Sequence, residues 1–252
     1  MTRPGQPSGP RAKESLVFAV EATVEALYRY PFKSMRGETV DDVRLGSRGM
    51  AGDREWAATF PDGRVGSCKT WKHVRRLDGL LAYAARTRHG RVEVHAPTGA
   101  VLTAGDPDLD AALTALAGEP VRASRESGTP HFDIGAVHLI SRSALTALAA
   151  EVPGGSVVPV ARFRPNIVIA GEWGPGFEDD WIGREVSIGE TTRLEITEQT
   201  ERCVTVTLPQ PGVPRDKEVL RVLAERRNTN FGVYAKVIRE GSVRFGDRVR
   251  VS

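Results

Sequence analysis

Short apolar segments separated by glycine and proline are the feature that most constrains the fold of this chain. Its 252 residues include 26 glycines and 16 prolines. Glycine allows the backbone angles that tight turns need, and proline ends or bends a strand. This punctuation favours many short strands joined by turns over a bundle of long helices. We therefore expect a turn-rich fold that is mainly β with some α.

Three segments nevertheless predict helices. Residues 106–117 carry leucines at helical spacing. Ser141 is a suitable N-cap for a helix over residues 143–151, and residues 216–228 have the pattern of an amphipathic helix. The basic segment 68–78 is irregular and predicts at most a short helix.

The charge of the chain limits the partners that it can bind over a broad surface. The formal net charge is +3, and residues 1–15 hold three basic residues against one acidic residue. This tail is rich in proline and glycine, so we expect it to be disordered. The rest of the chain is close to neutral. We therefore expect no nucleic-acid partner, although a local anion-binding pocket is compatible with this charge.

Cysteine content and hydropathy predict the compartment. The two cysteines, Cys68 and Cys203, lie far apart and form no CxxC pair, so the sequence predicts neither a disulfide framework nor a zinc site. Reduced thiols are typical of the cytoplasm, which is the expected location. No apolar run reaches 18 residues, so no membrane span is expected. Cys68 has no obvious partner and is interpreted as a structural thiol.

Cys203 lies in a segment, residues 197–207, whose residues alternate as in a strand. In an extended chain, Val204 and Val206 would point to one face, and Cys203 would share the other with threonine hydroxyls. Arg202 can lower the pKa of the thiol if the two side chains converge, and a thiolate binds metals and attacks electrophiles. The alternative is that Cys203 is a small buried hydrophobic residue, as most free cysteines are.

Several basic and hydroxyl side chains follow predicted strands and could contact an anion. Lys33 and Ser34 lie on a loop after a strand expected to run from about Leu16 to Tyr30, and the helix beginning at Ser141 offers free N–H groups. Alternatively, the loop is a solvated turn and Ser141 only caps its helix. Two further candidates are arginines: Arg54 after a glycine-rich turn, which could instead pair with a nearby acid, and Arg164, which in an extended chain would face the same side as Arg162.

Four motifs occur in a fixed order along the chain: Tyr30-Pro31-Phe32-Lys33-Ser34, Gly52-Asp53-Arg54, Arg162-Phe163-Arg164-Pro165-Asn166 and Thr200-Glu201-Arg202-Cys203. This ordered set resembles the MOSC family, the molybdenum-cofactor sulfurase C-terminal domain, together with its N-terminal β-barrel domain. Among its members, the chain looks most similar to the mitochondrial amidoxime-reducing component and its bacterial counterparts. The resemblance implies a MOSC N-terminal β-barrel-type domain over residues 16–125 and a β-barrel-like MOSC core over residues 126–252, with a few covering helices.

The same resemblance implies a bound molybdenum cofactor, Mo-molybdopterin, and a role for individual residues. Cys203 matches the metal ligand, and Arg202 and Phe231 match positions near the metal. The positions that hold the pterin and its phosphate match Lys33, Ser34, Arg54, Ser141, Arg164 and Asn166. The motif departs from the eukaryotic reductases, which often carry Cys-Ser-Arg-Cys where this chain has Thr200-Glu201-Arg202-Cys203.

The implied function is a molybdenum-cofactor oxidoreductase that reduces small N-hydroxylated compounds. No haem or iron–sulfur motif is present, so electrons would come from a separate reductase. Two alternatives stay open: a sulfur carrier or transferase with a persulfide on Cys203, and a non-catalytic carrier of the cofactor. We further expect a monomer and no pyridoxal phosphate.

Overall fold

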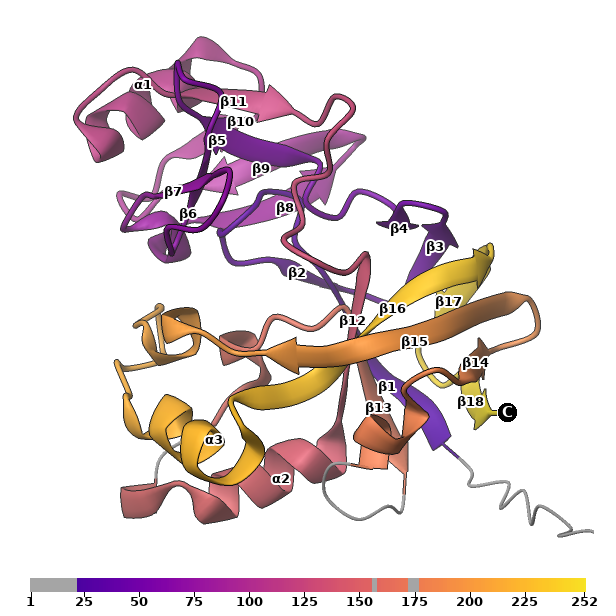
Figure 1. Ribbon diagram of the computed structural model, residues 1–252. Helices are drawn as coiled ribbons and strands as arrows, with labels where there is room; N and C mark the ends of the chain where they lie inside the picture. The colour runs from indigo at the N-terminus through magenta and orange to yellow at the C-terminus, as the bar shows by residue number, and fades with distance from the viewer. Residues whose placement is uncertain (1–21, 156–157, 172–176) are drawn as a thin grey trace, which may run out of the picture.

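The computed structural model describes residues 22–155, 158–171 and 177–252 (Figure 1). The tail expected to be disordered, residues 1–15, and the strand start expected near Leu16 lie outside the described residues. The described part is mainly β with a few helices, as the sequence predicts.

A closed barrel forms the lower part of the molecule in Figure 1. Within the described residues it has seven strands, in the order β13 (Ile167–Gly171), β12 (Val137–Ser141), β16 (Asn230–Arg239), β15 (Thr192–Glu201), β14 (Glu185–Ile188), β18 (Arg248–Val251) and β1 (Ala22–Arg29). The pairing of β1 with β13 closes the ring. Closure gives each strand of the ring two neighbouring strands, and the interior is filled by apolar side chains such as Leu27, Leu139 and Leu194.

A second unit, residues 56–125, lies above the barrel in Figure 1 and is called the N-terminal unit here. One of its sheets has the order β11 (Arg122–Arg125), β5 (Trp56–Thr59), β6 (Val65–Ser67) and β7 (Val74–Arg76). The other contains β8 (Ala84–Arg88), β9 (Arg91–His95) and β10 (Val101–Thr103). The helix α1 (Pro107–Ala117) confirms the predicted leucine spacing, since Leu109 and Leu113 are buried in this unit's core.

The two ends of the chain share sheets, so the barrel is not built from the C-terminal half alone. The first described strand, β1, pairs with β13 and β18, and β2 (Glu38–Val40) extends the sheet from β1. In addition, β3 (Asp42–Gly46) pairs with β4 (Gly49–Met50) and with β17 (Gly241–Arg244) near the C-terminus. The chain crosses from the barrel side to the N-terminal unit at residues 51–55 and returns at residues 126–136.

Helices α2 (Arg142–Glu151) and α3 (Glu218–Arg227) cover the lower end of the barrel (Figure 1). Both were predicted from the sequence. The side chain of Ser141 caps α2 by accepting a hydrogen bond from the backbone N–H of Ala144 at 3.0 Å, which confirms the predicted N-cap. Between these helices and the barrel lies a core that includes Phe163 and Phe231.

The extended conformation predicted for residues 197–207 is wrong after Glu201. There β15 ends, and Cys203 becomes the N-cap of a 3₁₀ helix, η5 (Val204–Thr207). The backbone N–H of Val206 donates to the Cys203 carbonyl at 3.2 Å, which coils the chain. As a result Val206 is buried while Val204 is 43% exposed, so the two valines do not share a face.

Two other local predictions are also wrong. Residues 68–78 contain a turn and the short strand β7 (Val74–Arg76) in place of a helix, because the backbone of β7 pairs with β6. Arg162 ends a 3₁₀ helix, η3 (Val160–Arg162), and Arg164 has a φ of 55°. The two arginines therefore do not lie on one side of an extended chain.

Candidate functional site

A pocket opens where the barrel meets the N-terminal unit. Both halves of the sequence contribute to its wall, and we call it the cationic pocket. It brings together seven of the predicted site residues: Lys33, Ser34, Arg54, Arg164, Asn166, Arg202 and Cys203. The other residues that line it are Ser67, Cys68, Lys69, Phe132, Asp133, Gly135, His138, Arg162, Phe163, Glu201, Thr205, Val206 and Tyr234.

Two predicted site residues, Ser141 and Phe231, do not line this pocket. The Ser141 side chain is buried, and its hydroxyl donates to the Glu178 carboxylate at 2.8 Å. The backbone N–H of Ser141 also donates to Glu178, at 3.3 Å. The N-terminus of α2 therefore faces a carboxylate of the chain itself. Phe231 packs its ring against Phe163, with centroids 4.5 Å apart.

Three of the residues that line the pocket have an unusual backbone conformation. Ser34, Arg54 and Arg164 have φ angles of 64°, 53° and 55°. Residues with a Cβ rarely adopt positive φ, and such conformations cluster at functional sites because the surrounding structure must hold them. In this chain the left-handed turns direct the side chains of three separate segments into one pocket.

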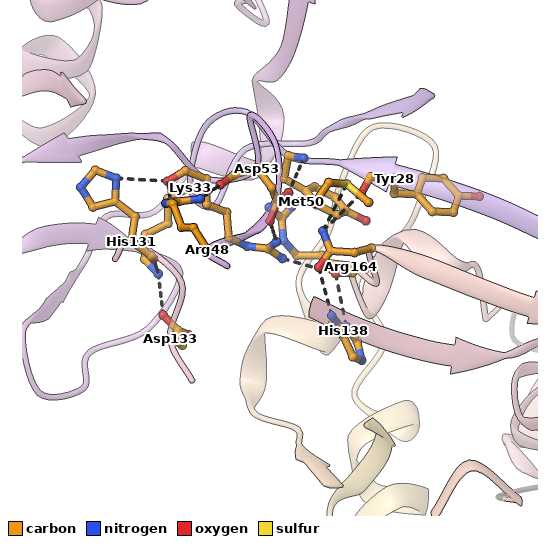
Figure 2. A network of polar contacts seen from close by, with 12 residues as sticks. Tyr28, Lys33, Arg48, Met50, Asp53, His131, Asp133, His138 and Arg164 are labelled. Carbon is orange, nitrogen blue, oxygen red and sulfur yellow. Dashed lines mark hydrogen bonds and ion pairs between the residues drawn. The ribbon is translucent and has the colours of Figure 1, made fainter. Parts of the chain in front are cut away.

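Tyr30 organises two of the pocket arginines. The guanidinium carbon atoms of Arg164 and Arg54 lie 4.3 and 4.9 Å from its ring centroid, a favourable cation–π arrangement. Arg164 Nη1 donates to the Met35 carbonyl at 2.7 Å, and Arg54 forms an ion pair with Asp53. Figure 2 shows part of this network around Arg164 and Asp53. The two side chains are therefore fixed before any ligand binds.

Asn166 lines the pocket, but its amide already serves the fold. The Asn166 Oδ1 accepts from the backbone N–H of His138 at 3.1 Å, and Nδ2 donates to the Tyr28 carbonyl at 3.3 Å. These bonds join the start of β13 to β12 and β1. Asn166 thus positions the strands around the pocket.

His138 and Arg202 form a buried pair at the base of the pocket. The His138 Nδ1 lies 3.3 Å from the Arg164 carbonyl (Figure 2). A carbonyl only accepts, so Nδ1 carries the proton and Nε2 accepts from Arg202. Burial and the Arg202 charge hold the pKa of His138 well below its ordinary value. Arg202 also donates to the carbonyls of Phe231 and Phe163, and burial lowers its pKa to about 10.

Cys203 is half-buried, and its Sγ lies 3.3 Å from the Thr205 hydroxyl. The second cysteine, Cys68, lines the same pocket and is buried against Leu81 and Leu208. Burial raises the pKa of the Cys68 thiol. Cys203 is therefore the more accessible of two thiols at one site.

The pocket is strongly cationic and has unused donors. Six lysine and arginine side chains line it against two carboxylates, Asp133 and Glu201. Among the described residues, Arg164 Nη2 and Arg162 Nε are buried and have no hydrogen-bond partner. Buried N–H groups are nearly always paired in folded proteins, so these two atoms mark a place for an acceptor. The cavity has a volume of about 120 Å³.

Sequence reasoning missed several residues that line this pocket, among them Lys69, Asp133, His138 and Tyr234. His138 lies in β12, the strand that ends at Ser141. A histidine within a largely apolar strand could have been recognised in the sequence as a candidate site residue. Asp133 lies in the loop between β11 and β12, where no periodic pattern indicates the direction of a side chain.

The fold and the pocket define a β-barrel protein with a cationic binding site that contains an accessible thiol. Comparison with protein-family models then identifies the family. The MOSC domain matches residues 129–250, and the MOSC N-terminal beta barrel domain matches residues 21–130. The chain therefore belongs to the MOSC family with the N-terminal β-barrel domain, a family associated with molybdenum-cofactor binding.

A solved structure shares the fold of this chain. The YUAD protein from Bacillus subtilis is 14% identical in sequence and superposes with a TM-score of 0.52. The alignment covers 92% of this chain and 95% of the YUAD chain. YiiM from Geobacillus stearothermophilus is also 14% identical, and the alignment covers 47% of this chain and 54% of the YiiM chain with a TM-score of 0.35. A comparison with curated protein sequences finds no significant match. No helix within residues 22–155, 158–171 and 177–252 is long and apolar enough to cross a membrane.

Proposed function

We propose that the cationic pocket binds a molybdenum–molybdopterin cofactor and that the protein reduces small N-hydroxylated compounds. In this proposal Cys203 is the protein ligand of the metal. Lys33, Ser34, Arg54 and Arg164 hold the pterin and its phosphate. Electrons come from a separate reductase.

The observation that carries the proposal is the combination of an accessible thiol with unpaired guanidinium donors in one pocket. Arg164 Nη2 and Arg162 Nε are buried without an acceptor, and phosphate oxygens are strong acceptors for such groups. Thiolates are soft ligands that suit thiophilic metals. The residues present therefore fit an anionic cofactor that carries such a metal.

When bound, the cofactor supplies the two electrons that reduction of an N–OH group requires. The overall reaction consumes two electrons and two protons for each N–O bond cleaved, and it releases one water molecule. Tyr234 lines the pocket, and burial raises the pKa of its phenol, so the Oη stays protonated and can donate a hydrogen bond to a substrate. The neutral His138 has both ring nitrogens engaged, and we assign it the role of holding Arg202.

Metal analysis of paired cysteine variants tests the proposal. Protein purified from a host that makes the cofactor should contain about one molybdenum per chain. Cys203→Ser should lose the metal, whereas Cys68→Ser, a thiol of the same pocket, should keep it. Equal molybdenum content in wild type and Cys203→Ser would overturn the ligand assignment. Reduction of an N-hydroxylated amidine by the loaded protein, with a chemical electron donor, then tests the reaction.

The same measurements distinguish the sulfur-carrier alternative, in which Cys203 holds a persulfide. That alternative predicts an added mass of about 32 Da on Cys203 and no molybdenum, since a persulfide adds one sulfur atom to the thiol. A non-catalytic carrier predicts bound molybdenum without reduction of any substrate. We favour the oxidoreductase because a persulfide carrier has no need for six cationic side chains around its thiol.

A further inference from the structure

A carboxylate bridges two lysines inside the cationic pocket. Asp133 Oδ1 accepts from Lys33 Nζ at 2.5 Å, and Asp133 Oδ2 lies 2.7 Å from Lys69 Nζ. Lys33 Nζ also donates to the His131 carbonyl at 2.6 Å. Figure 2 shows Lys33 with Asp133 and His131. Each oxygen of the Asp133 carboxylate thus pairs with one lysine ammonium group.

Burial explains why this arrangement forms. The side chain of Lys33 is only 6% exposed, and a buried ammonium without a partner is strongly destabilising. Burial lowers the pKa of Lys33, and the Asp133 charge opposes that shift. Burial acts to raise the pKa of Asp133, but the two lysines outweigh it and hold that pKa well below its ordinary value. Asp133 therefore supplies the negative charge that the pocket needs when no ligand is bound.

Asp133 belongs to residues 126–136, the segment that joins β11 to β12 and crosses from the N-terminal unit to the barrel. Side-chain bonds hold this segment: the backbone N–H of His131 donates to Glu126 at 2.8 Å, and the His131 ring lies 3.2 Å from the Arg54 carbonyl. The pocket that this segment borders has a volume of about 120 Å³, well below the roughly 300 Å³ at which typical ligand pockets begin.

We propose that Lys33 and Lys69 form the phosphate-binding end of the pocket and that Asp133 is an internal carboxylate that a phosphate monoester replaces. This inference rests on the proposed function, and it adds Lys69 and Asp133 to the site. A phosphate carries up to two negative charges and several acceptor oxygens, so it can bind both ammonium groups. It would repel Asp133, and displacement of Asp133 with its segment would enlarge the pocket.

Titration of the cofactor-free protein with inorganic phosphate tests this directly. Asp133→Asn removes the competing charge while keeping the shape, so phosphate should bind roughly tenfold to a hundredfold more tightly. Lys69→Gln should weaken phosphate binding by a similar factor. Lys72→Gln is the matched control, because Lys72 is a nearby exposed lysine that contacts Trp71 and not Asp133. Its affinity should equal that of the wild type.

The opposite result for Asp133→Asn would overturn the proposal. If this variant binds phosphate as weakly as Lys69→Gln, Asp133 holds the lysines in place for the ligand and does not compete with it. An unchanged affinity in Lys69→Gln would remove Lys69 from the site. Repeating the titrations anaerobically with metal-free molybdopterin distinguishes the source of the phosphate. If Lys69→Gln weakens the binding of both ligands, the site binds the cofactor's phosphate. If Lys69→Gln weakens the binding of inorganic phosphate alone, the site binds the free ion.

A second measurement needs no variant and covers the case in which Asp133→Asn fails to fold. Hydrogen exchange of wild-type backbone amides in residues 129–135 should become faster when phosphate is added, since the segment loses its bond to the lysines. Slower or unchanged exchange at saturating phosphate would refute displacement. Molybdenum content is independent of both readouts. Lys69-dependent phosphate binding without molybdenum would refute the proposed function alone, and molybdenum with Lys69-independent binding would refute this inference alone.

Discussion

Gly232 has a φ of 76° in β16, at a point where the strand passes close to the buried His138–Arg202 pair. A Cβ at this position would lie 2.6 Å from the Leu139 carbonyl oxygen and 2.9 Å from His138 Nε2. Both distances are shorter than van der Waals contact. Gly232→Ala should therefore strain the backbone and also displace the histidine that accepts from Arg202.

A matched control separates these two effects. Gly63 has a φ of 80°, and a Cβ there would meet nothing within 4 Å. Each alanine costs about 1–2 kcal/mol for its left-handed backbone, and this cost is common to both variants. Only Gly232→Ala adds overpacking, which typically costs about 2 kcal/mol. For a chain of this size that difference corresponds to a further fall in Tm of roughly 4–8 °C.

Thermal unfolding followed by circular dichroism measures the difference, and molybdenum content measures its effect on the site. We expect Gly63→Ala to keep the metal and Gly232→Ala to lose most of it. Equal Tm values for the two variants would refute the argument, because it would mean that the space around Gly232 accommodates a methyl group. A lower Tm with full metal content would show that the packing of His138 does not control the pocket.

Three other predictions follow from the same structure. Ser141→Ala should lower stability by about 1 kcal/mol through loss of the N-cap but leave molybdenum content unchanged, because Ser141 does not line the pocket. Loss of metal from a variant that still folds would show that Ser141 contributes to the cofactor site. The lowered pKa of His138 means that the unfolded chain binds a proton that the folded chain excludes, so stability should fall as pH drops below the ordinary histidine value of 6.5. Between pH 6.5 and 5, His138→Gln should reduce this loss of stability by up to about 1.4 kcal/mol per pH unit. His73→Gln, at an exposed histidine, is the control and should leave the loss unchanged. Identical Tm–pH profiles for wild type and His138→Gln would contradict the burial of a neutral imidazole. Arg202→Lys leaves backbone carbonyls unpaired, so it should cost about 1–3 kcal/mol in denaturant unfolding, while Arg44→Lys on the surface should change stability by less than about 0.5 kcal/mol; equal values for the two would argue against the buried network.

Local interactions made part of this structure readable from the sequence. Helix α1 was predicted from its leucines, and the cap of α2 was predicted from Ser141, because both depend on residues within four positions along the chain. The conformation at Cys203 was not predictable in the same way. A strand pattern continues through Val206, but in the structure Val206 is buried in the core that α2 and α3 complete, and α2 is distant in sequence.

The sequence by itself determined the mainly β composition, the helices, and the order of the motifs that lead to the MOSC family. The tertiary structure decided which of the candidate side chains meet. Lys33 and Asp133 are separated by 100 residues, and Tyr28 and Asn166 by 138. Contacts of this range depend on the pairing of β1 with β13, which brings segments from the two halves of the chain together. The tertiary structure also separates Ser141 from the pocket and places Lys69, Asp133 and His138 within it, because side-chain direction in loops and strand ends is set by the packing of the whole fold and not by local sequence.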